Sequence, residues 1–91
     1  MAMHVPVSLV DEGGHVIHST IVNMSDEGLM VECSPNEHIP VFKLFSIEVE
    51  SHFNGKCYAV WQNQNRAGMA LCTPIHPAIV LGLARRFPTP A

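Results

Sequence analysis

The first 42 residues of this chain contain no lysine and no arginine, although they hold six acidic residues. Only five lysines and arginines occur among all 91 residues, and charged residues make up 14% of the chain, against about a quarter in an average domain. Nucleic-acid binding requires a clustered basic surface, so this composition argues against DNA or RNA as a partner. A chain with so little charge exposes apolar surface, which favours a protein partner.

Zinc clusters, disulfide frameworks and membrane spans are also missing from the sequence. Cys33, Cys57 and Cys72 are odd in number, far apart and without a Cys-x-x-Cys pair, which favours free, reduced thiols. No run approaches the roughly 20 apolar residues of a membrane helix. The N-terminus has neither the basic segment nor the long apolar run of a signal peptide. We therefore expect a cytoplasmic protein without membrane insertion.

The six histidines do not have the spacing of a metal site. His15 and His18 lie three apart on an expected strand, so their side chains point to opposite faces and cannot share an ion. The remaining four fall on loops or near strand ends: His4, His38, His52 and His76. Since no Cys or His spacing matches a zinc motif, we expect neither a metal nor a resident cofactor.

Apolar residues recur at every second position through most of the chain, which is the pattern of half-buried strands. In the fourth expected strand, the apolar residues at 45, 47 and 49 face the core and the polar residues at 46, 48 and 50 face solvent. Gly13-Gly14 and Asn54-Gly55 are the expected hairpin turns. Pro6 indicates an edge strand or a strand start, because proline cannot donate to a ladder. Six strands are expected, at residues 4–10, 15–24, 29–33, 44–50, 56–62 and 67–72.

A helix is expected over residues 77–87. Pro77 suits its first position, and Pro88 ends it. The apolar residues of this segment recur at helical spacing: Ile79, Val80, Leu83, Ala84 and Phe87. Short antiparallel strands with one apolar face close into a small barrel, which removes exposed edges. The sequence therefore predicts a single all-β domain over residues 1–91, with a six-stranded antiparallel barrel at about 4–72 and a C-terminal α-helix over an open end or flank.

The hexad Asn-Met-Ser-Asp-Glu-Gly at residues 23–28 connects the second and third expected strands. This Asn-x-Ser-x-x-Gly pattern resembles the signature of PilZ domains, the bacterial receptors for cyclic di-GMP. Residues 58–71 resemble the closing hairpin of that family, in which a Val-Trp pair is followed by a polar turn and a Gly-apolar strand. The resemblance covers residues 4–72, and the helix that follows is also as expected for the family.

This resemblance implies a barrel and a link to cyclic di-GMP signalling, with Asn23, Ser25 and Gly28 as guanine-contacting positions. Asn23 and Ser25 share one face of a strand, and glycine lets the chain turn with positive φ or lets a ligand approach. The alternative is that the hexad only shapes its hairpin, because its residues are ordinary turn formers. A PilZ domain also carries an upstream Arg-x-x-x-Arg pair that grips the phosphates, and nothing in the first 42 residues replaces it.

Two hypotheses follow for function, neither of them enzymatic. The first is an atypical PilZ domain that acts mainly through protein–protein contacts, with weak or no direct binding of cyclic di-GMP. Its expected contact surface is the open barrel face, the loop at 34–42 and the helix. The second is a direct cyclic di-GMP receptor in which the fold or a second chain supplies the phosphate contacts from Arg66, Arg85 or Arg86. Trp61 is expected to share the inward face of Cys57 and pack against the core or helix.

Overall fold

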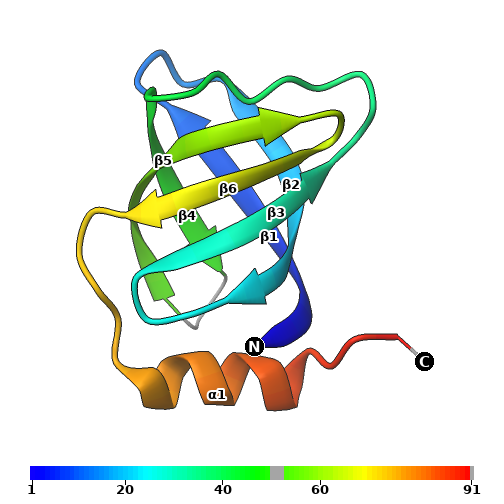
Figure 1. The fold of residues 1–91 in the computed structure, drawn as a ribbon. Coiled ribbons are helices and arrows are strands. Elements are labelled where there is room, and N and C mark those ends of the chain that lie inside the picture. Colours follow the sequence, from blue (N-terminus) through cyan, green and yellow to red (C-terminus); the bar gives the residue numbers. More distant parts are fainter. Residues whose placement is uncertain (50–52, 91) are drawn as a thin grey trace.

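A computed structural model describes residues 1–49 and 53–90, and it confirms the predicted all-β barrel with a C-terminal helix. The strands close into an antiparallel barrel in the order β1-β2-β3-β6-β5-β4 (Figure 1). Each described strand therefore has a partner on both sides. The elements are β1 (Ala2–Asp11), β2 (Val16–Met24), β3 (Gly28–Cys33), β4 (Leu44–Val49), β5 (Phe53–Asn63), β6 (Arg66–Leu71) and α1 (Pro77–Arg86).

The core of the barrel is built by the period-two alternation of its strands. In β4, Phe45, Ile47 and Val49 are buried, as predicted, while Ser46 and Glu48 face solvent. Removing these side chains from water is the main favourable contribution to folding. The outward direction expected at residue 50 and the histidine at 52 lie outside the described residues.

The predicted turn at Gly13-Gly14 is confirmed, whereas Pro6 lies neither on an edge strand nor at a strand start. The carboxylate of Asp11 accepts hydrogen bonds from the amides of Gly13 and His15, each at 2.9 Å, and Gly14 has a φ of 86°. Pro6 lies inside β1, opposite Thr20 of β2, and not at the start of the strand, because β1 begins at Ala2.

The predicted turn at Asn54-Gly55 is wrong. Both residues lie inside β5, where Asn54 is opposite Glu48 and Gly55 is opposite Ile47. The register that places Cys57 opposite Phe45, with both side chains buried, continues the pairing past these two residues to the start of β5. Burial of a strand face fixes register more strongly than local turn preference.

The helix α1 lies across one end of the barrel, close to the beginning of β1 (Figure 1). Val80 and Leu83 are buried against the core, and the amide of His4 donates to the carbonyl of Phe87 at 2.9 Å. Ile79 was expected on this packed face but is exposed, because the buried stripe is centred between positions 80 and 83. Within the described residues, no helix has the length and apolar character needed to cross a membrane.

Candidate functional site

The Ser25 hydroxyl is used inside the turn between β2 and β3. Its Oγ accepts hydrogen bonds from the amides of Glu27 at 3.4 Å and Gly28 at 3.2 Å, and the Ser25 amide donates to the Gly28 carbonyl at 2.8 Å. The amide of Ile75 donates to the Asp26 carbonyl and the amide of Leu71 donates to the Glu27 carbonyl, each at 2.9 Å. The turn is therefore fixed internally and also tied to the segment that leaves β6, so Ser25 has the contacts of a turn former.

The Asn23 side chain is exposed near the end of β2, and its oxygen also has a partner within the chain. Asn23 Oδ1 accepts a hydrogen bond from the N-terminal ammonium of Met1 at 2.8 Å, and the same ammonium donates to the Met24 carbonyl at 2.8 Å. Hydrogen bonds from a charged donor are stronger than neutral ones. This oxygen therefore already accepts one strong hydrogen bond within the chain.

Gly28 does not have the positive φ that was one of its two expected roles. Positive φ angles occur in the described residues at Gly14, Phe42 and Gln64, so Gly28 does not use that conformation. A Cβ atom built on Gly28 would lie 2.9 Å from the Met69 carbonyl oxygen of β6. The missing side chain therefore makes room for the neighbouring strand.

The three motif residues do come together at one place on the outer wall. Asn23, Ser25 and Gly28 line the same open hollow of about 240 Å³, whose remaining walls are Met24, Leu29 and Met30. The sequence predicted this grouping correctly, since the spacing puts all three residues at one strand connection. The hollow is lined mainly by apolar atoms and backbone, and its lining residues include no arginine or lysine.

Arg66 is not brought to this hollow. It pairs with Glu32 across β6 and β3, with 2.9 Å between Arg66 Nε and Glu32 Oε2. Glu32 is four residues along β3 from Gly28, a separation of roughly 13 Å at the rise of a strand. The fold therefore does not support the predicted role of Arg66 as a phosphate contact for the motif.

Arg85 and Arg86 lie in the last turn of α1, at the end of the barrel that carries the start of β1. The helix end is bonded to His4, and Ala2 of the same strand is opposite Asn23. Neither arginine forms an ion pair with any residue in 1–49 or 53–90. Strand and helix connectivity therefore places these two cations at the same end of the barrel as Asn23.

Trp61 lies on the outer wall, and the prediction that it packs inward is wrong. The β5–β6 register shifts between Ala59 and Trp61, which is the signature of a β-bulge. Two side chains in succession, Val60 and Trp61, consequently face solvent, although Ala59 is buried. A Cβ atom on Gly68 would lie 2.0 Å from Trp61 Nε1, so the indole lies flat across that glycine.

The indole and the motif belong to one row across the outer wall. Trp61 is opposite Gly68, Gly68 is opposite Met30, and Met30 is opposite Asn23. The indole of Trp61 and the amide of Asn23 thus lie at the two ends of this row, with Gly68 and the Met30 side chain between them. Sequence reasoning missed this arrangement, because the bulge that turns the indole outward depends on pairing with β6. The glycine in the strand opposite the tryptophan was the available signal.

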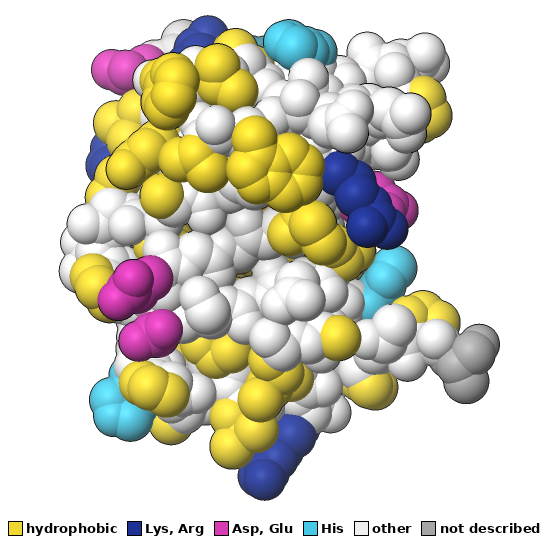
Figure 2. Space-filling model, viewed as in Figure 1, with side chains coloured by type: hydrophobic (Ala, Val, Ile, Leu, Met, Phe, Trp, Pro, Cys, Tyr) yellow, Lys and Arg dark blue, Asp and Glu magenta, His cyan; other side chains and the backbone are white. Residues whose placement is uncertain are grey.

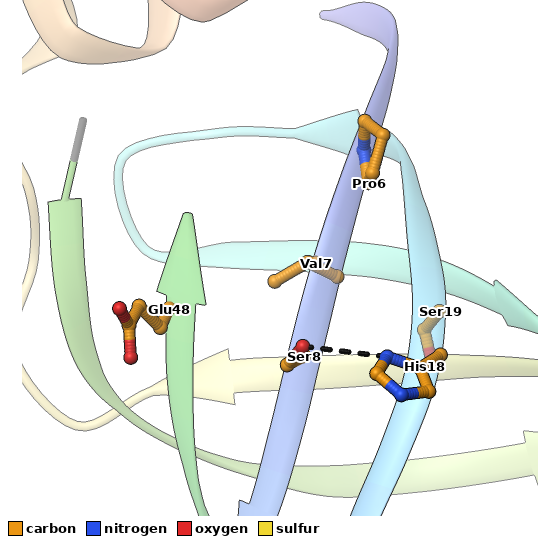
Figure 3. Close-up of a pocket in the computed structure, with 6 residues that line it drawn as sticks. All are labelled: Pro6, Val7, Ser8, His18, Ser19 and Glu48. Carbon is orange, nitrogen blue, oxygen red and sulfur yellow. Dashed lines mark hydrogen bonds between the residues drawn. The ribbon is translucent and has the colours of Figure 1, made fainter. Parts of the chain in front are cut away.

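A second hollow on the outer wall, of about 500 Å³, contains Ser8, His18 and Glu48 (Figure 3). Ser8 Oγ lies 3.5 Å from His18 Nδ1, and Glu48 is opposite Ser8 on the other side of β1. The order across the sheet is therefore carboxylate, hydroxyl, imidazole. A nucleophilic triad needs the imidazole between the other two groups, so this arrangement does not activate the serine.

The buried thiols are poor nucleophiles. Burial raises the pKa of the Cys57 thiol to about 12, with a smaller contribution from Cys72, and burial also raises the pKa of Cys33. A thiol must ionise to attack a substrate or bind a metal, so both groups are inert at neutral pH. Cys72 is exposed. In residues 1–49 and 53–90, no three His, Cys, Asp or Glu side chains gather as a metal site.

No protein-family model matches this chain, and no curated protein matches its sequence. The PilZ resemblance therefore stays a prediction based on the hexad and the closing hairpin.

Proposed function

We propose that this chain is a non-catalytic binding domain, an atypical PilZ-like module of cyclic di-GMP signalling that acts mainly through protein contacts. In this proposal it binds cyclic di-GMP weakly or not at all. The observation that carries it is the state of the motif: the Ser25 hydroxyl and the Asn23 oxygen both have partners within the chain. At both positions a dinucleotide would meet a polar atom that is already hydrogen-bonded within the chain.

The charge around the motif supports the same conclusion. Cyclic di-GMP carries two phosphate charges, and a guanidinium is the side chain best suited to hold them. Arg66 is paired with Glu32 at the far end of β3, and Asp26 and Glu27 stand in the motif itself. The loss of two charge-assisted contacts, each worth roughly 1.5–3 kcal/mol, weakens binding by about two to four decades.

A direct receptor is the second candidate, and one observation favours it. The last turn of α1, with Arg85 and Arg86, is bonded to β1 close to the residue opposite Asn23. A ligand that reached from the hollow at Asn23 to this helix end would meet two cations that have no ion pair among residues 1–49 and 53–90. In this version the helix end replaces the upstream arginine pair of the family.

Isothermal titration with cyclic di-GMP at low and high salt tests the proposal. We expect no binding heat at micromolar ligand and at most millimolar affinity. Micromolar binding that weakens as salt rises would contradict the proposal and favour the receptor.

A matched pair of variants then separates the two candidates. The double variant Arg85→Ala/Arg86→Ala removes the cations at the helix end, and Arg66→Ala removes one at the far end of β3. A receptor of the second kind loses binding in the first variant and keeps it in the second.

A further inference from the structure

Four exposed apolar side chains gather on the outer wall at the end of the barrel away from α1. This aromatic patch consists of Val41, Phe42, Val60 and Trp61, which are 45%, 74%, 44% and 43% exposed. The segments are adjacent, because Val41 is bridged to Ala59 and the Phe42 amide donates to the Ala59 carbonyl at 2.8 Å. Figure 2 shows hydrophobic side chains collected over the same half of the molecule, with charged side chains of both signs at the edges.

The backbone holds these side chains outward at a cost. Phe42 has a φ of 61°, a left-handed conformation that is unfavourable for a bulky residue. The bulge in β5 exposes Val60 and Trp61 in succession, where regular alternation would turn one of them inward. Strained backbone at an exposed aromatic residue is a mark of a functional surface.

An ion pair flanks the patch on each side. On the β4 side, Lys43 follows Phe42 and lies 3.2 Å from Asp11, measured from Nζ to Oδ2. On the β6 side, Arg66 pairs with Glu32. Each flank therefore carries one cation and one anion, and β5 with the patch lies between the two flanks.

We propose that the aromatic patch binds a second copy of this chain through a two-fold axis that lies in the interface and runs along β5. Rotation about this axis places the β4 flank of one copy on the β6 flank of the other, because β5 lies between β4 and β6. Lys43 of each copy then faces Glu32 of the other, which is the reciprocal pairing that an isologous interface requires. A surface with both signs on both flanks is complementary to itself, whereas a one-sign rim would indicate a partner of opposite charge.

The size of the patch is consistent with a reversible dimer. Two aromatic and two valine side chains at these exposures present on the order of 400 Å² of apolar surface, more than a scattered set of surface residues gives. A stable interface covers about 800 Å² on each partner, so the two charged flanks must supply the rest. This inference does not depend on cyclic di-GMP and stands or falls separately from the proposed function.

Sedimentation equilibrium and tryptophan fluorescence measure the association directly. Trp61 is the one tryptophan in the chain, so its emission reports on the patch alone. We expect a monomer–dimer equilibrium in the micromolar range and a shift of emission to shorter wavelength as the concentration rises. A monomer up to millimolar concentration would overturn the proposal.

Phe42→Asn removes the most exposed ring and suits the positive φ of that position, so the variant keeps its fold. We expect its dimer dissociation constant to rise at least about tenfold, as for an aromatic hot spot. The matched control is Leu81→Asn, which makes the same kind of change at an exposed residue of α1, outside the patch. An equal effect of both variants, or of neither, would place the interface elsewhere.

Charge reversal tests the two-fold arrangement. Lys43→Glu and Glu32→Lys should each weaken self-association, because each puts like charges opposite one another. An equimolar mixture of the two variants should recover association, since each glutamate then faces a lysine in both contacts. Weakening without recovery in the mixture would refute the proposed pairing.

Discussion

Gly28 and Gly68 both lie where a side chain does not fit, but the obstacle differs. The Cβ position of Gly28 meets a backbone carbonyl of β6 at 2.9 Å. The atoms nearest to the Cβ position of Gly68 belong to the indole of Trp61, the far part of a side chain that can rotate away. Rigid and movable neighbours therefore give these two glycines different tolerance to substitution.

Gly28→Ala is expected to destabilise the fold by about 1–3 kcal/mol, because β3 and β6 must separate to admit the methyl group. Gly68→Ala is expected to cost less than about 1 kcal/mol, since the indole can move. Urea unfolding measures both, and the emission of Trp61 should shift in the second variant alone. Equal losses of stability would contradict this distinction.

The motif shows how far single residues can be interpreted from sequence. The grouping of Asn23, Ser25 and Gly28 follows from local spacing and was predicted. The packing that requires a glycine at position 28 was not predicted, because the obstructing carbonyl belongs to Met69, which is distant in sequence. The direction of Trp61 was missed for the same reason, since it depends on the register between two strands.

At the scale of elements, α1 contributes to stability through one face. Leu83 is 1% exposed against the barrel core, and Leu81 is exposed two residues earlier. Val80 lies one helical turn before Leu83 and shares its buried stripe. The contact between helix and barrel therefore depends on few side chains.

Leu83→Ala is expected to lower the free energy of unfolding by about 2–4 kcal/mol, the range for a buried leucine that leaves a cavity. Leu81→Ala is the matched control and should change it by less than about 0.5 kcal/mol. Chemical denaturation with two probes, circular dichroism and Trp61 emission, measures both. A small effect at Leu83 would mean that the barrel is stable without its helical cover.

The strands and the helix were predicted well wherever a single sequence pattern indicated their type. The alternation in β4 and the proline-bounded helix gave both the type and the approximate limits of those segments. The failure at Asn54-Gly55 arose where a local turn signal competed with the register that buries Phe45. Tertiary burial prevailed there, as it commonly does over local preference.

For the whole molecule, the buried thiol of Cys57 links stability to alkaline pH. Its pKa is raised to about 12 in the fold, whereas an exposed thiol ionises near 9.0. Between these values the unfolded chain releases a proton that the folded chain keeps, so ionisation favours unfolding. The contribution of the neutral thiol is thus complete below pH 9 and is lost as the pH rises toward 12.

We expect stability to fall above pH 9 with a slope approaching about 1.4 kcal/mol per pH unit from this one group. Cys57→Ala should be less stable at neutral pH and should lose less stability as the pH rises. Urea unfolding from pH 8 to 10.5, for both proteins, gives the difference. Parallel pH profiles would exclude Cys57 as the cause.

The strand β1 is bonded to segments from the first half, the middle and the C-terminal end of the chain. β1 pairs with its neighbour β2, with β4 through Ser8 opposite Glu48, and with the end of the helix through His4 and Phe87. Contacts between residues so far apart in sequence slow folding, because long loops must close before any contact forms. Because β1 pairs with β4 and with the end of the helix, the barrel closes only when these distant segments meet. Closure is therefore expected to be the slow step of folding, which stopped-flow refolding should detect on the scale of milliseconds to seconds.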